Sequence, residues 1–155
     1  MSLREQVQDA VNRGAIDEIE AMFVEGTRAL RHLVGMTYRD DAVVCATAAR
    51  AIGLAARRHP KKVKEIITRQ VWAMESGANT NAVNAPMVLE AIANEAPEMF
   101  LRLVTDLAQL AQDPSLQPGI ARVLKIVAER CPGQVGRQMA AGLNAKGVGC
   151  ATNGH

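Results

Sequence analysis

The sequence contains few aromatic residues, few cysteines and no long apolar run. Aromatic side chains make up 3% of the 155 residues, so alanine, leucine, valine and methionine must fill the core, which favours packed helices over strands. No stretch approaches the roughly 20 consecutive apolar residues that a membrane span requires. The segment MSLREQVQDA is charged from Arg4 onward and lacks the apolar region of a signal peptide.

The cysteine content indicates the cellular compartment, and the net charge limits the classes of partner that the protein could bind. Three widely spaced cysteines, an odd number, argue against a disulfide framework and favour a reducing cytoplasm. The formal net charge of +2 produces no whole-molecule field that would draw the chain to nucleic acid or to an anionic membrane. We therefore expect a cytoplasmic protein that does not bind a membrane.

What the sequence does contain is an internal repeat marked by three prolines. When Pro60, Pro97 and Pro132 are aligned, at spacings of 37 and 35 residues, three segments fall into register: RAIGLAARRHPKKVKEII, MVLEAIANEAPEMFLRLV and RVLKIVAERCPGQVGRQM. Apolar residues recur in the same columns on both sides of each proline, with helical spacing. Proline suits the first position of a helix and restricts the residue before it. Each proline is therefore predicted to separate two helices.

The pattern of apolar residues and turn residues predicts helix pairs and no strands. Ser2 and Glu5 form a capping box at the start of a helix over 2–13. One long helix is predicted over 16–34, with a possible bend at Gly26. The three later pairs are predicted at 41–58 with 61–75, 83–95 with 98–112, and 117–130 with 133–145.

The stretch YRDDAVVCATAARAIGLAARRHPKKV resembles a HEAT-type repeat. It has a polar turn, a first helix rich in alanine and a second helix led by proline, although it lacks the arginine often found early in the first helix. The resemblance covers three units across 37–146, with a weaker unit before them. It implies an all-α fold, a short right-handed α-solenoid of about four antiparallel helix pairs over 1–146, followed by a glycine-rich tail over 147–155. Such a solenoid presents its faces to other proteins.

Two segments supply candidate contacts for a partner. Seven basic residues cluster around Pro60, the first of the three aligned prolines, and Glu65 is the only acid among them. They are Arg50, Arg57, Arg58, Lys61, Lys62, Lys64 and Arg69. They predict a solvated face or a contact for an acidic protein, and the alternative is a ridge that holds nucleic-acid phosphates. The linker ESGANTNAVNAP is longer and more polar than a turn requires. It is either a flexible linker or a recognition loop that uses Asn79, Thr80, Asn81 and Asn84.

The sequence shows no convergent set of catalytic groups. The histidines at 32, 59 and 155 lack a companion at metal-ligand spacing, and His32 and His59 are interpreted as solvated or capping side chains. Cys45 lies among alanines and is interpreted as a small buried apolar residue. Asp40 and Asp41 precede an alanine-rich helix, where N-capping is the expected role.

Cys150 and His155, near the end of the tail, are weak candidates for a metal site, because two ligands do not make one. We therefore expect a non-enzymatic adaptor without a cofactor, which binds another protein as a monomer or as a homodimer through one end. The alternatives are a nucleic-acid-binding solenoid that uses the basic residues of 57–69, and an accessory factor that brings the Cys/His tail to a metal or redox partner.

Overall fold

The computed structural model describes residues 1–76 and 83–137, and these residues form helices and turns without a strand. A helical turn at 134–137 follows the last named element. The elements are α1 (Leu3–Arg13), α2 (Ile16–Val24), α3 (Arg28–Met36), α4 (Ala42–Leu54), α5 (Pro60–Glu75), α6 (Ala85–Glu95), the 3₁₀ helix η2 (Pro97–Leu103), α7 (Val104–Leu110) and α8 (Gln117–Arg130).

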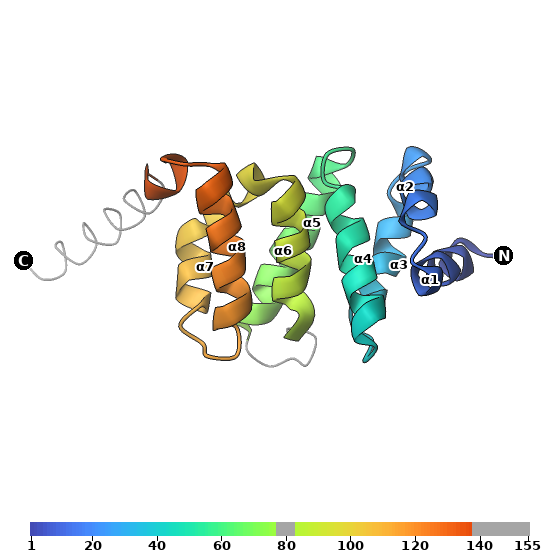
Figure 1. Ribbon diagram of the computed structural model, residues 1–155, viewed down its shortest axis with the longest axis horizontal. Coiled ribbons are helices and arrows are strands. Elements are labelled where there is room, and N and C mark those ends of the chain that lie inside the picture. The colour runs from blue at the N-terminus through green and yellow to red at the C-terminus, as the bar shows by residue number, and fades with distance from the viewer. Residues whose placement is uncertain (77–82, 138–155) are drawn as a thin grey trace, which may run out of the picture.

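The helices succeed one another along the long axis of the molecule in the order of the chain. Figure 1 shows α4, α6 and α8 side by side in one row, with α5 and α7 behind them and α1, α2 and α3 at one end. Within the row α6 packs against both α4 and α8, and α3 packs against α4. Each neighbour therefore covers an apolar face that a single helix pair would leave exposed.

The three predicted hinges share one backbone conformation. The residue before each proline lies outside the helical region, with φ and ψ of −129° and 59° at His59, −143° and 68° at Ala96, and −127° and 61° at Cys131. Each of these residues donates its N–H to the carbonyl four residues earlier at 2.8 Å. Pro60 then begins α5 and Pro97 begins η2. The prediction that each proline separates two helical segments is confirmed, because proline forces its predecessor out of the helical region.

The predicted helix over 16–34 is wrong, because the chain forms two helices there. Gly26 has φ of 138°, a left-handed conformation that side-chain-bearing residues avoid, and it separates α2 from α3. The helix predicted at 98–112 is likewise two elements, η2 and then α7. The predicted caps are correct. Ser2 and Glu5 form their capping box, and the side chain of Asp41 accepts from the N–H groups at the start of α4.

Small residues allow the row of helices to pack closely. A Cβ at Gly53 of α4 would lie 2.4 Å from the carbonyl oxygen of Ala91 in α6, and a Cβ at Gly119 of α8 would lie 2.4 Å from Cβ of Pro86. The repeat columns supply the core between the helices, since Ile52, Ala55, Leu89, Ile92 and Val127 are all fully buried. Small side chains therefore bring the helix axes near one another, and Phe100 is one of the few aromatic residues buried in the core.

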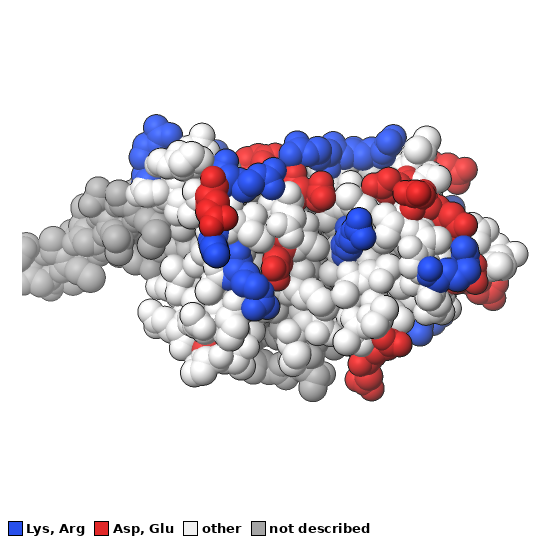
Figure 2. All heavy atoms as spheres, viewed as in Figure 1, with Lys and Arg blue, Asp and Glu red and all other residues white. Residues whose placement is uncertain are grey.

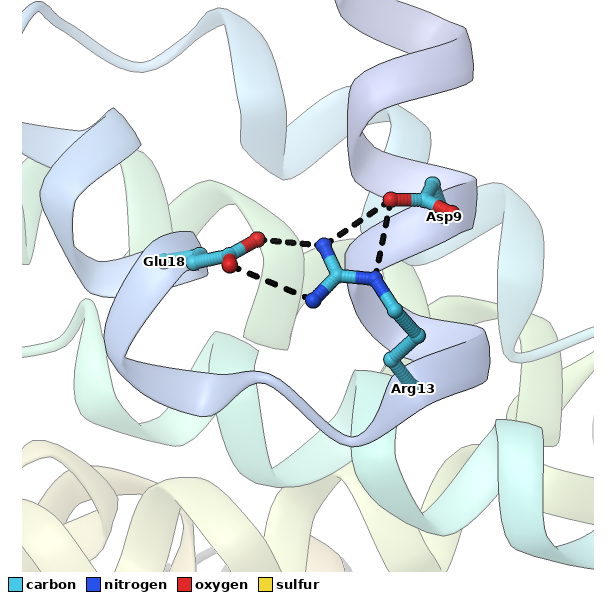
Figure 3. Close-up of polar contacts among 3 residues, drawn as sticks. All are labelled: Asp9, Arg13 and Glu18. Atoms are coloured by element: carbon cyan, nitrogen blue, oxygen red, sulfur yellow. Dashed lines mark hydrogen bonds and ion pairs between the residues drawn. The ribbon is translucent and has the colours of Figure 1, made fainter.

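An arginine joins the first two helices. Arg13, at the end of α1, donates from Nε and Nη2 to Oδ2 of Asp9 at 3.0 and 2.8 Å. It also donates to both carboxylate oxygens of Glu18 in the first turn of α2, through Nη1 at 3.2 Å and through Nη2 (Figure 3). The hydrogen bonds from Arg13 lower the pKa of Glu18, so this junction weakens when acid protonates the carboxylate.

Candidate binding groove

The predicted basic residues are divided among several surfaces. Arg57, Arg58 and Lys61 are exposed around the α4–α5 turn, and Figure 2 shows Lys and Arg side chains along this edge of the molecule. Lys64 lines a groove between α5 and η2, whereas Lys62 lines a groove between α5 and α3. Arg50 belongs to α4 and lies beside Glu90 and Glu95 of α6. The seven cations therefore do not form one continuous track.

The groove between α3 and α5 combines apolar and cationic side chains. It encloses a cavity of about 310 Å³. Four lining residues come from α3 and the turn after it, and four come from α5: Leu30, Arg31, Val34, Tyr38, Lys62, Ile66, Arg69 and Gln70. On each element they recur every three or four residues, so one face of each helix points at the groove. Leu30 and Ile66 are buried at its floor, whereas Arg31 and Arg69 are exposed at its rim.

Positive charge is in excess at this rim. Lys62 pairs with Glu65, with 3.1 Å between Nζ and Oε2. Arg31 and Arg69 form no ion pair with any residue that the structure describes. Two guanidinium groups therefore remain available to a carboxylate that enters the groove, and a guanidinium binds a carboxylate through two parallel hydrogen bonds.

Two further side chains give the groove polar anchors. Gln70 is only 3% exposed and lines the cavity, so its amide can form hydrogen bonds with a polar group that enters the groove. Tyr38 is 45% exposed and presents an aromatic face at the edge of the groove. One turn beyond Arg69 on α5, Trp72 is 67% exposed. Aromatic side chains of this kind supply much of the energy of protein interfaces.

Asn84 is the one member of the predicted recognition loop that the structure describes in contact with the rest of the fold. Its Nδ2 donates to the carbonyl oxygen of Thr37 at 2.6 Å and lies 3.7 Å from Sγ of Cys45. The side chain thus ties the start of α6 to the end of α3. Asn79, Thr80 and Asn81 lie outside the described residues.

Cys45 is held as a protonated thiol. It is 2% exposed, and Sγ–H donates to the carbonyl oxygen of Arg39 at 2.8 Å. Burial raises the pKa of this thiol, which removes the thiolate that nucleophilic chemistry requires. The interpretation of Cys45 as a buried apolar residue agrees with this environment.

His59 is a capping side chain. Its Nε2–H donates to the carbonyl oxygen of Phe23 in the last turn of α2 at 2.7 Å, and its ring meets the Phe23 ring edge-on at 81°. Within residues 1–76 and 83–137, no three His, Cys, Asp or Glu side chains lie close enough to hold a metal ion. Cys150 and His155 lie outside the described residues.

No protein-family model, curated protein or solved structure matches the chain. None of the helices that the structure describes has the length and apolar character needed to cross a membrane. The chemistry of the described surfaces is therefore the basis for inferring a function.

Sequence reasoning identified Lys62 and Arg69 but missed the rest of the groove. The missing members include Arg31, Tyr38, Ile66 and Gln70. A signal was present, because Leu30, Val34 and Tyr38 follow one another at intervals of four residues. It was missed because the predicted helix ended at Val34 and left Tyr38 outside it, whereas α3 continues to Met36 and leads directly to Tyr38.

Proposed function

We propose that the protein is a non-enzymatic, HEAT-like α-solenoid adaptor that binds an acidic, apolar-anchored segment of another protein in the groove between α3 and α5. The observation that carries this proposal is the apolar floor bordered by Arg31 and Arg69. An apolar side chain of the partner would fill the cavity, while carboxylates of the same segment would meet the two guanidinium groups.

The repeat hinges support the solenoid part of the proposal. Three hinges of the same geometry, at 59–60, 96–97 and 131–132, relate successive units that each add one helix to the row of α4, α6 and α8. Repeated units of this kind bury a continuous core by stacking, and they leave grooves between successive helices on each face. The α3–α5 groove is one of these.

Charge supports an acidic partner over nucleic acid. A nucleic-acid strand needs a run of phosphate contacts along one track, but the basic residues around the hinge separate onto different surfaces. The groove instead offers cations around a closed apolar floor, which suits one short segment. The cytoplasm is the compartment that we propose, because three separate thiols suit a reducing environment.

A random-peptide display selection on the immobilised protein tests this function. We expect the enriched peptides to combine apolar anchors with Asp or Glu. Their affinity should fall at least tenfold, about 1.4 kcal/mol, when Arg31 or Arg69 is changed to Glu. The matched control is Arg102→Glu, a charge reversal in the neighbouring groove between α5 and η2.

The proposal fails if the selected peptides bind the Arg31→Glu and Arg69→Glu variants as tightly as the parent. It also fails if the selection yields no acidic peptides, or if Arg102→Glu weakens binding equally. NMR amide shifts confined to α3 and α5 on addition of a selected peptide would place the peptide in the groove. Shifts spread along the α4–α5 turn, obtained with a duplex oligonucleotide as the probe, would favour the nucleic-acid alternative.

A further inference from the structure

A second cavity lies on the other side of Arg31, between α1 and the C-terminal half of α3. Its volume is about 350 Å³. It is lined by side chains from α1, from α3 and from the turn before α4: Arg4, Gln8, Arg31, His32, Gly35, Met36 and Arg39. Three arginines from three segments of the chain thus converge on one cavity, and no carboxylate lines it.

The acidic side chains near this cavity bond to other groups or line a different cavity. On α1, Glu5 accepts from the N–H of Ser2 and Asp9 pairs with Arg13. The segment of α3 carries no acid. In the turn before α4, the side chain of Asp41 caps that helix, and Asp40 lines a different cavity beside Cys45.

The pKa of His32 reflects the same excess of positive charge. Burial lowers the pKa of its imidazole first, and the charges of Arg31, Arg4 and Arg28 lower it further. No carboxylate acts on this histidine in the opposite direction. The ring is therefore neutral at neutral pH, in a site that already holds more positive charge than the fold compensates.

Gln8 holds two of the arginines in place. Its amide is assigned with the oxygen toward the guanidinium groups, because the opposite orientation would set N–H groups against N–H groups. In this orientation Oε1 accepts from Nη2 of Arg39 at 3.0 Å and from Nε of Arg4 at 3.3 Å. The remaining N–H groups of both guanidinium groups form no ion pair with a described residue.

Gly35 leaves space at the floor of the cavity. A Cβ added to this glycine would have no heavy atom within 4 Å. The cavity is therefore open at the point where the helix backbone of α3 passes beneath it, between the side chains of Arg31 and Arg39. A bound group can approach α3 there more closely than it could over any other residue type.

We propose that this cavity is a binding site for a phosphoryl group, either of a free phosphate monoester or of a phosphoserine side chain. A phosphate dianion carries enough charge to pair with several guanidinium groups at once, and its oxygens match the planar fork of each. Arginine clusters are a recurring means of recognising phosphorylated segments. The site shares only Arg31 with the α3–α5 groove, so it stands whether or not the groove binds an acidic segment.

The test is a titration of the intact protein with inorganic phosphate, followed by NMR at fixed ionic strength. We expect saturable shifts at Gly35, Arg39 and the His32 imidazole, and a rise in the pKa of His32 when phosphate is bound, because an anion offsets the surrounding cations. Arg39→Gln and Arg4→Gln should each weaken binding at least tenfold. Arg39→Lys keeps the charge and loses the planar fork, so it should weaken binding by less than Arg39→Gln does.

Two controls separate the site from a general effect of charge. Arg102→Gln removes an exposed arginine outside the cavity and should leave phosphate binding unchanged. Gly35→Leu changes no charge but fills the cavity, so it should abolish binding while circular dichroism shows an intact fold. Equal shifts with chloride, or undiminished binding by both Arg39→Gln and Gly35→Leu, would overturn the proposal.

A peptide pair identifies the source of the phosphoryl group. The probes are acetyl-Ala-Ala-phosphoserine-Ala-Ala-amide and its unphosphorylated counterpart. Tighter binding of the phosphopeptide than of inorganic phosphate assigns the site to a phosphorylated segment. Equal or weaker binding assigns it to a free phosphate monoester. Binding of both peptides with the same affinity would contradict a phosphoryl site.

Discussion

At the scale of single residues, the glycines of this fold differ sharply in what surrounds them. Gly53→Ala should destabilise the protein by about 1–3 kcal/mol, because the new Cβ would overlap the backbone of Ala91 in α6. The control is Gly35→Ala, where the Cβ meets open space and the gain in helix propensity should stabilise by up to about 1 kcal/mol.

Urea denaturation followed by circular dichroism measures both variants. Equal effects of the two substitutions would mean that helix propensity alone decides the outcome. That result would contradict the close approach of α4 and α6. The same helix contact explains why alanine is abundant in the repeat columns, since larger residues would push the two backbones apart.

At the scale of helices, the side-chain amide of Asn84 joins the start of α6 to the end of α3. Asn84→Ala should destabilise the protein by about 1–3 kcal/mol, because the buried carbonyl of Thr37 would lose its 2.6 Å donor. Asn94→Ala on the same helix is the matched control, since Asn94 is exposed and its side chain bonds to no described residue. Its effect should stay within about 0.5 kcal/mol.

Thermal unfolding of the two asparagine variants distinguishes these roles. If Asn84→Ala and Asn94→Ala lower the midpoint equally, Asn84 does not join the helices as the structure indicates. In that case its side chain would be free for the recognition role that the sequence predicted.

The helices also show which parts of the fold a sequence can predict. The hinges were predictable because proline restricts itself and its predecessor by local sterics, whatever surrounds them. The division between α2 and α3 was not, because Gly26 is compatible with a bent helix as well as with a break. The 3₁₀ form of η2 was not predictable either, because the apolar spacing over 98–112 is equally compatible with one α-helix.

The candidate sites were harder to predict than the hinges. Arg31, His32 and Arg39 lie near one another in the sequence. Their partners Arg4 and Gln8 come from another helix, and only tertiary packing brings them to the same cavity. The dense basic run around Pro60 is the more conspicuous cluster in the sequence, although the structure distributes it over several surfaces.

At the scale of the whole molecule, the helices have unequal numbers of neighbours. Both α4 and α6 are flanked on two sides, whereas α1 lies at one end. We expect amide hydrogen exchange to be slowest in α4 and α6 and faster in α1, because the end of a stacked array opens at lower cost than its middle. Exchange at neutral pH, measured by mass spectrometry, tests this order. Uniform protection across all helices would indicate that the molecule opens as one unit.

The position of Trp72 has a practical consequence. It is the only tryptophan in the chain, and it lies exposed on α5 one turn beyond Arg69. Its indole is already in contact with water in the native protein, so its fluorescence emission changes little when the helices melt. A molecule that covers this face of α5 shields the ring, shifting the emission to shorter wavelength and protecting it from a quencher such as iodide. The fluorescence of Trp72 therefore reports whether a molecule covers this face of α5, and it is nearly insensitive to unfolding.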